Sequence, residues 1–142
     1  MNRARDPLVT SRIMSRVRNK DSKAELMLRR ELHRRGLRYR LHCRDVLGTP
    51  DICIKRYRLA VFVDGDMWHG NEHKRRGLDN LAELFPNNTE FWVAKITGNI
   101  QRDHEVSDGL AQAGWTVLRL WESLVLENPN EAADMVEAAR AL

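Results

Sequence analysis

The stretch TPDICIKRYRLAVFVDGDMWHG, residues 49–70, decides the fold because it combines two apolar runs with a group of polar side chains. The runs at 51–55 and 59–65 are short and separated by the polar segment KRYR, which predicts two strands joined by a hairpin turn. Pro50 favours an extended conformation at Thr49, just before the first strand. The chemistry-bearing side chains gather at the ends of the strands: Asp51, Asp64, Asp66, Trp68 and His69.

These carboxylates have the outline of a metal-dependent nuclease site. Adjacent strand ends bring Asp51 and Asp64 close together, and Asp64 and Asp66, two residues apart on a strand, project to the same face. Mg²⁺ takes one or two carboxylates, and waters and substrate phosphate fill its remaining positions. Aspartates are also common turn residues at strand ends, so the pattern alone leaves both interpretations open.

Nearby polar residues favour the nuclease interpretation. His69 follows Asp66 by three residues, where a general base can reach a metal-activated water. Asn99, Arg102 and Asp103 form a polar cluster on an otherwise apolar helical segment. Asp66 stands where a PD-(D/E)xK nuclease carries its lysine, so we expect a histidine to act as the base.

The chain before and after this stretch predicts helices and one further strand. Ser22 and Glu25 have the spacing of a capping box at the start of a helix, and Gly36 stands where that helix ends. A strand is expected at 37–43. Segment 71–88 lacks clear periodicity and is predicted to be an irregular insertion.

The C-terminal part predicts a long amphipathic helix over 89–114, a buried strand at 115–122 and a closing helix from 128. A further short helix is expected at 10–18. The order α, β, β, β, α, β, α implies at least one parallel strand pair, because a strand, a helix and a strand follow one another. We therefore expect an α/β fold, with a mixed β-sheet flanked by helices in one domain over 1–142.

Charge is distributed unevenly along the chain. Residues 1–60 hold 17 Lys/Arg and 6 Asp/Glu, a net charge of +11, whereas residues 61–142 have a net charge of −7. The basic half fits a polyanion as partner and equally fits a solvated face. Two cysteines, no apolar run of about 18 residues and no secretory signal favour a reduced, cytoplasmic compartment.

Five ordered blocks, within roughly residues 11–123, resemble the very short patch repair (Vsr) endonucleases. They read SRIMSRVRNKDSKAELMLRRELHRRGLRYRLH, GTPDICI, AVFVDGDMWHG, TEFWVAKITGNIQRD and GWTVLRLWE. The resemblance implies a restriction-endonuclease-like core related to the PD-(D/E)xK fold. It also implies Mg²⁺-dependent nicking of one DNA strand beside a T:G mismatch, in a bacterial cytoplasm.

The same resemblance implies roles for individual residues. Asp51 matches the aspartate that bridges metal, and the main-chain carbonyl of Val63 matches a second metal ligand. His69 matches the histidine that activates or holds the water, and Asp103 matches an acid that supports it. Asp64 stands where the family has a further polar active-site residue, and its role stays open.

Glu25 matches a helix glutamate near the metal-bound waters, although the capping box alone explains it as well. Apolar wedges that open the base stack are implied at Met67, where methionine replaces the usual aromatic residue, and at Trp68. Trp92 is either a third wedge or a core residue. The DNA-binding residues expected from these arguments are Met67, Trp68, Trp92, Lys95, Asn99, Arg16 and Lys20.

One departure from the family concerns zinc. The positions of the family's structural zinc ligands read Asp66, Asn71, His73 and Ser123 here, and one good ligand is far from four. We therefore expect no structural zinc.

The sequence predicts a monomer whose partner is double-stranded DNA that carries a mismatch. Mismatch-repair proteins or a cytosine methyltransferase are the context that the resemblance suggests. Two alternatives stay open: a Vsr-like site-specific or defence endonuclease that cuts undamaged duplex DNA, and a catalytically inactive DNA-binding module. Both endonuclease readings use the same catalytic residues, so the sequence does not separate them.

Overall fold

The computed structural model describes residues 21–141. The helix expected at 10–18 and the expected DNA contacts Arg16 and Lys20 lie outside these residues. In the described part, one sheet has the strand order β1 (Arg40–Leu41), β2 (Ile52–Ile54), β3 (Leu59–Asp64), β4 (Thr116–Trp121). β1–β2 and β2–β3 pair antiparallel and β3–β4 pair parallel, which confirms the mixed sheet.

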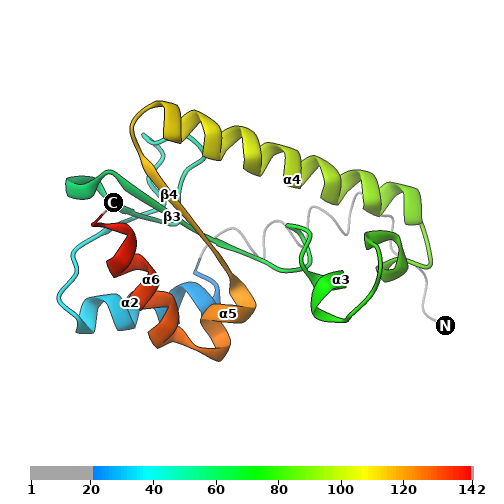
Figure 1. Cartoon of the computed structure of the whole chain (residues 1–142), viewed down its shortest axis with the longest axis horizontal. Coiled ribbons are helices and arrows are strands. Elements are labelled where there is room, and N and C mark those ends of the chain that lie inside the picture. The colour runs from blue at the N-terminus through cyan, green and yellow to red at the C-terminus, as the bar shows by residue number, and fades with distance from the viewer. Residues whose placement is uncertain (1–20, 142) are drawn as a thin grey trace.

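Helices cover both faces of this sheet. α2 (Lys23–Arg34), α5 (Glu122–Glu127) and α6 (Pro129–Ala139) lie on one face, and α4 (Thr89–Gln112) crosses the other (Figure 1). The predicted α/β fold is confirmed. No helix within residues 21–141 is long and apolar enough to cross a membrane.

Strand alternation sorts the core into two clusters. Ile52, Ile54, Leu59 and Val61 pack with α2, α5 and α6, whereas Cys53, Ala60 and Phe62 pack against α4. Because side chains alternate along a strand, Asp64 falls on the α4 face with Ala60 and Phe62. The end of β3 therefore presents a carboxylate toward α4.

The local signals at α2 and at the hairpin are confirmed. The Ser22 hydroxyl accepts a 3.2 Å hydrogen bond from the Glu25 N–H and caps α2. Gly36 follows the helix with φ +82°. Between β2 and β3 the short 3-10 helix η1 (Lys55–Tyr57) makes the turn, and Arg58 closes it in the left-handed conformation.

Other local predictions were wrong, and the strand expected at 37–43 is limited to Arg40–Leu41. Segment 71–88 contains α3 (Glu72–Arg75) and the 3-10 helix η2 (Leu81–Leu84) rather than irregular backbone alone. β4 is mostly half-buried, because it is an edge strand of the described sheet. Thr49 has φ +47°, since its N–H closes a tight turn onto the Val46 carbonyl at 3.0 Å.

Asp66 does not share a face with Asp64, because β3 ends at Asp64 and the chain turns. The Asp66 carboxylate accepts from the Ser123 N–H at 2.9 Å, from the Ser123 hydroxyl at 2.7 Å and from the Asn71 amide at 2.8 Å. Three of the four positions that the family resemblance assigns to zinc thus form a hydrogen-bonded network. This network ties the loop after β3 to the start of α5.

Removing this acceptor is expected to destabilise the fold. Asp66→Ala leaves the Ser123 N–H and the Asn71 amide without their partner, so the free energy of unfolding falls by about 2–4 kcal/mol. Urea denaturation measures the loss. Asp79→Ala, at an exposed position of the same loop region, is the control and changes stability by less than about 0.5 kcal/mol. Equal effects of the two substitutions would contradict the structural role of Asp66.

Candidate active site

The site lies where β3 runs on past the first residue of β2, Ile52. The Val63 N–H donates a 2.8 Å hydrogen bond to Asp51 Oδ2. The register pairs Ile52 with Val61, so two residues further on Pro50 stands opposite Val63. The N–H and the carbonyl of a strand residue point to the same edge, so the Val63 carbonyl also points toward Pro50. Proline has no N–H, and so it offers no hydrogen-bond donor to this carbonyl. A carboxylate and a carbonyl oxygen therefore share one edge, and both are ligands that Mg²⁺ prefers.

Glu25 faces this edge from α2. Its side chain is buried, and its carboxylate accepts a 2.9 Å hydrogen bond from Arg29 Nη2. His42 Nε2 lies 3.1 Å from the same guanidinium nitrogen. Burial, and then repulsion by Asp51, raises the pKa of Glu25 to about 7, although Arg29 acts to lower it. Glu25 therefore gains or loses its proton near neutral pH.

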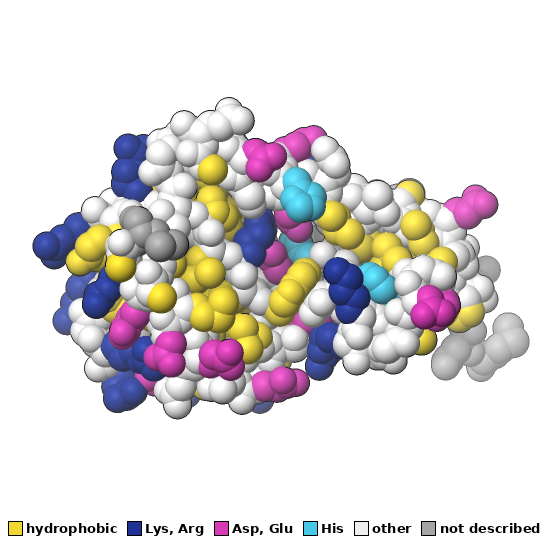
Figure 2. Space-filling model, in the orientation of Figure 1, with side chains coloured by type: hydrophobic (Ala, Val, Ile, Leu, Met, Phe, Trp, Pro, Cys, Tyr) yellow, Lys and Arg dark blue, Asp and Glu magenta, His cyan; other side chains and the backbone are white. Residues whose placement is uncertain are grey.

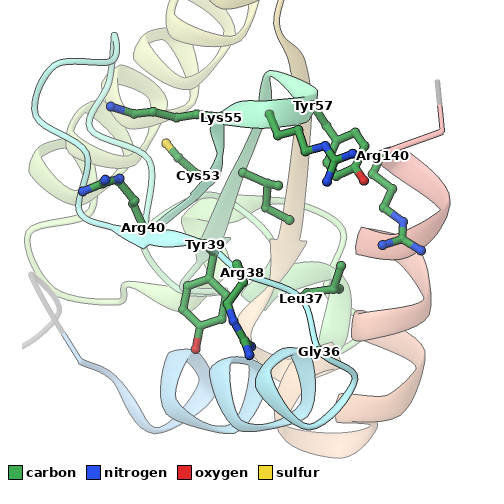
Figure 3. Close-up of a pocket in the computed structure, with 11 residues that line it drawn as sticks. Gly36, Leu37, Arg38, Tyr39, Arg40, Cys53, Lys55, Tyr57 and Arg140 are labelled. Carbon is green, nitrogen blue, oxygen red and sulfur yellow. The ribbon is translucent and has the colours of Figure 1, made fainter.

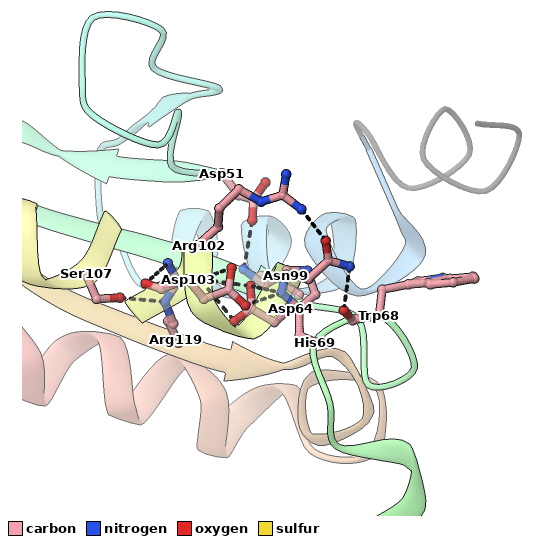
Figure 4. A network of polar contacts seen from close by, with 10 residues as sticks. Asp51, Asp64, Trp68, His69, Asn99, Arg102, Asp103, Ser107 and Arg119 are labelled. Carbon is pink, nitrogen blue, oxygen red and sulfur yellow. Dashed lines mark hydrogen bonds and ion pairs between the residues drawn. The ribbon is translucent and has the colours of Figure 1, made fainter. Parts of the chain in front are cut away.

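His69 lies between two carboxylates. Its Nδ1 is 2.5 Å from Asp103 Oδ2 on α4 and 3.9 Å from Asp64 Oδ1 at the end of β3 (Figure 4). When Nδ1 donates its proton to Asp103, Nε2 is the nitrogen that accepts. The close approach of the loop to α4 requires Gly70, whose added Cβ would lie 2.5 Å from Ile100 Cδ1.

Arg119 connects these groups from β4. Its Nη1 lies 3.2 and 3.1 Å from the two Asp64 oxygens, its Nη2 donates to the Asp103 carbonyl at 3.2 Å and its Nε donates to Ser107 Oγ at 2.7 Å (Figure 4). The guanidinium carbon also lies 4.1 Å from the centre of the Phe62 ring. Burial raises the pKa of Asp64, and the positive charges of His69 and Arg119 oppose that rise.

Two cavities differ in their chemistry. A cavity of about 330 Å³ is lined by Asp64, His69, Asp103 and Arg119, and Figure 2 shows acidic, basic and histidine side chains meeting at a hollow beside α4. Another cavity, of about 500 Å³, lies at the hairpin end of the sheet (Figure 3). Its lining contains none of the predicted catalytic residues, and its cations are Arg38, Arg40, Lys55, Arg56 and Arg140. The first cavity therefore belongs to the candidate active site.

Among the described residues, two groups of side chains bring possible metal ligands within 4.8 Å of one another. They are the Asp64 group, Asp64, His69 and Asp103, and the Glu25 group, Asp21, Glu25 and His42. In each group an arginine already contacts the carboxylates, Arg119 in the first and Arg29 in the second. Asp51 belongs to neither group, and the Asp51–Val63 edge carries no such arginine contact in the described structure.

Aromatic side chains gather beside the loop that carries His69. The Trp92 ring centre lies 5.6 Å from those of Trp68 and Phe85 and 5.1 Å from that of Phe91. Trp92 is half-buried and belongs to neither core cluster, which favours the wedge over the core interpretation. The Asn99 amide donates to the Trp68 carbonyl at 2.9 Å and so connects α4 to this loop.

The structure brings the predicted catalytic side chains Asp64, His69 and Asp103 within ligand distance of one another. Asp51 lies near enough to Glu25 to affect its pKa, and the pKa of Asp51 is itself affected by Asp64 and His69. Met67 and Lys95 are half-buried, and their contacts with DNA stay predictions. The sequence reading missed Arg29, His42 and Arg119. Arg29 was detectable as the residue four positions after Glu25 on a helix, where oppositely charged side chains meet.

Comparison with known proteins identifies the family. A sequence model described as DNA mismatch endonuclease Vsr matches residues 4–75. A type II nicking enzyme of Haemophilus parainfluenzae is 40% identical over 122 residues, which are 86% of this chain and 83% of the relative. The chain belongs to the Vsr family.

Two further relatives of this Vsr-family protein carry informative names. A type II nicking enzyme of Neisseria meningitidis serogroup C is 41% identical and covers 94% of this chain and 86% of its own length. The DNA mismatch endonuclease Vsr of Escherichia coli K12 is 31% identical, covering 82% of this chain and 71% of the relative. The protein is therefore a DNA endonuclease with the restriction-endonuclease-like fold of its family, and DNA is its substrate.

The raised pKa of Glu25 predicts a pH-dependent stability. Since that pKa is about 7 rather than 4.5, the folded state holds the proton longer than the unfolded state does. Stability of the metal-free protein therefore falls as pH rises from about 5 to about 7. Glu25→Gln removes this titration, so its stability relative to wild type increases by about 2–3 kcal/mol between pH 5 and pH 8.

Urea unfolding in EDTA at the two pH values measures this difference. Glu83→Gln, at an exposed position, is the control and is expected to leave the pH profile unchanged. A Glu25→Gln protein that follows the wild-type profile would contradict the raised pKa.

Proposed function

We propose that this Vsr-family protein is a Mg²⁺-dependent endonuclease that nicks one strand of duplex DNA at or beside a T:G mismatch. The observation that supports this most strongly is the edge at which Asp51 and the Val63 carbonyl face the same side. A divalent ion held there would offset charge on the scissile phosphate and lower the pKa of the attacking water. His69 lies in the loop that follows the same strand, with its Nδ1 3.9 Å from Asp64 Oδ1.

His69 is the general base of the proposed reaction. Its Nε2 takes the proton of the attacking water, while its Nδ1 keeps the proton that it donates to Asp103 at 2.5 Å. Asp103 fixes the ring, and the negative charges of Asp103 and Asp64 stabilise the imidazolium that forms.

Glu25 completes the proton chemistry on the α2 side. Its carboxyl, with a pKa of about 7, can accept a hydrogen bond or a proton from waters beside Asp51. Burial also raises the pKa of Asp51, and the Val63 N–H counteracts that rise by bonding the ionised form. A nearby cation favours the ionised form further, so Asp51 binds metal best as the carboxylate.

The aromatic cluster supports mismatched DNA as the substrate. Trp68 and Trp92 lie with their ring centres 5.6 Å apart, beside Met67 on the loop that carries His69. Apolar side chains that enter the base stack do so at the least cost where the pair is weak. A T:G pair next to the scissile phosphate meets this condition, and the E. coli relative named as a mismatch endonuclease agrees with it.

Phosphate contacts hold the duplex across the site. Lys95 lies one helical turn after Trp92 on α4 and is proposed to reach the backbone, together with Asn99 and, from the N-terminal segment, Arg16 and Lys20. Each contact with phosphate should steepen the salt dependence of binding by about one counterion. A single nick requires one such site, so a monomer suffices.

A second candidate is a site-specific endonuclease that acts on undamaged duplex DNA. The relatives at 40% and 41% identity are named type II nicking enzymes, and these names do not mention a mismatch. The catalytic groups would be the same for both substrates, so the substrate itself must be tested.

The test uses end-labelled duplexes, either matched or carrying one T:G pair in varied contexts, with Mg²⁺. Wild type is expected to nick one strand beside the mismatch. Asp51→Asn keeps an acceptor for the Val63 N–H but loses the charge, so nicking slows by about 10²–10³-fold. Its affinity for the T:G duplex in Ca²⁺ should stay within about 3-fold, which is less than 1 kcal/mol.

Asp79→Asn is the matched control and should nick at the wild-type rate. Cleavage of both strands of matched DNA would favour the second candidate. Near-normal nicking by Asp51→Asn would show that the catalytic site has been assigned wrongly, and nicking in EDTA would contradict the metal requirement.

A further inference from the structure

We propose that Arg119 is the resident cation of the Asp64 group, and that it excludes a metal ion from that group. This inference rests on the proposed function and adds a positioning residue to it. The Asp64 group has the ligand spacing of a metal site, because one ligand atom from each of its members lies within 4.8 Å of the others.

Arg119 already contacts the carboxylates that would have to bind a metal ion in this group. Its Nη1 lies 3.1 and 3.2 Å from the two oxygens of Asp64 and 3.6 Å from Asp103 Oδ1. Both carboxylates therefore face a permanent positive charge, because a guanidinium does not lose its proton in proteins. A divalent ion added to this group would meet strong repulsion at short range.

Several contacts hold the Arg119 guanidinium in place. Nε donates to Ser107 Oγ at 2.7 Å, and Nη2 donates to the Asp103 carbonyl at 3.2 Å. The Phe62 ring lies against it, with 4.1 Å between the guanidinium carbon and the ring centre. These bonds and the stacking on the ring hold the planar fork over the carboxylates and oppose its movement to admit an ion.

These contacts also give Arg119 an indirect role in catalysis. Two of them are with α4, at Asp103 and Ser107, so the guanidinium joins β4 to the helix turn that positions the Asp103 carboxylate. Asp103 in turn holds His69 Nδ1 at 2.5 Å. Arg119 thus neutralises the buried Asp64 and the half-buried Asp103 carboxylates and orients the base through Asp103, without touching the substrate.

The first test counts metal ions rather than turnover. Free Mn²⁺ is measured by electron paramagnetic resonance while it is titrated into the full-length protein without DNA. Arg119→Met removes the charge and keeps most of the volume, so this protein is expected to bind one Mn²⁺ more than wild type. Arg119→Lys keeps the charge and should bind the wild-type number.

Arg34→Met is the matched control. It removes another ion-paired arginine, one that bonds Glu31 on the exposed face of α2, and should leave the Mn²⁺ count unchanged. Arg119→Gln is a second uncharged variant in case Arg119→Met does not fold, and circular dichroism checks each protein. An uncharged Arg119 variant that folds and binds no additional Mn²⁺ would overturn the proposal.

The second test measures nicking of the T:G duplex. Arg119→Met is expected to lower kcat by about 10–100-fold, with DNA affinity in EDTA within about 3-fold of wild type, and Arg119→Lys should recover most of the lost rate. A merely structural role predicts instead that the lysine variant is as impaired as the methionine variant. If wild type does not nick at all, the proposed function fails, while the Mn²⁺ count still decides the role of Arg119.

Discussion

The site depends on the hydrogen bond from the Val63 N–H to Asp51, which lies just before β2 begins, at the edge where β3 continues beyond it. In an ordinary antiparallel pair, the residue opposite Val63 would form hydrogen bonds with both its N–H and its carbonyl group. Here that residue is Pro50, which cannot donate, and the side chain of Asp51 takes the N–H. One interruption of the sheet thus orients a carboxylate and leaves a carbonyl oxygen beside it, with no need for strained backbone at Val63.

Gathering carboxylates at one edge of a sheet has an electrostatic cost, and the structure meets it with arginines. Burial raises the pKa of Glu25, Asp51 and Asp64. Arg29 bonds Glu25 from one side and Arg119 bonds Asp64 from the other, while Asp51 between them is bonded only by the neutral Val63 N–H among the described contacts. The negative charge that remains available is therefore concentrated at Asp51, where the proposed ion would bind.

The sequence predicted those structural features that depend on residues close together in the chain. The Ser22 cap and the turn between β2 and β3 depend on neighbouring residues, and both were predicted correctly. The parallel pairing of β3 with β4 followed from the order of the elements, because a helix between two strands returns the chain in the same direction.

What the sequence did not reveal depends on contacts between distant segments. Arg119 belongs to the site because β4 pairs in register with β3 and lies under α4, and no local pattern marks it. Asp66 looked like a partner of Asp64, but the turn after β3 directs it to Ser123, 57 residues along the chain. The proposed catalytic residues rest on family resemblance, since aspartates at strand ends are too common to identify a site.

Locating the bound metal would test the account most directly. Crystals of the protein with a T:G duplex, soaked with Mn²⁺, would show the ion by its anomalous scattering. We expect a peak within about 2.5 Å of both an Asp51 carboxylate oxygen and the Val63 carbonyl oxygen. A peak between Asp64 and Asp103, with Arg119 displaced and no ion at Asp51, would contradict it.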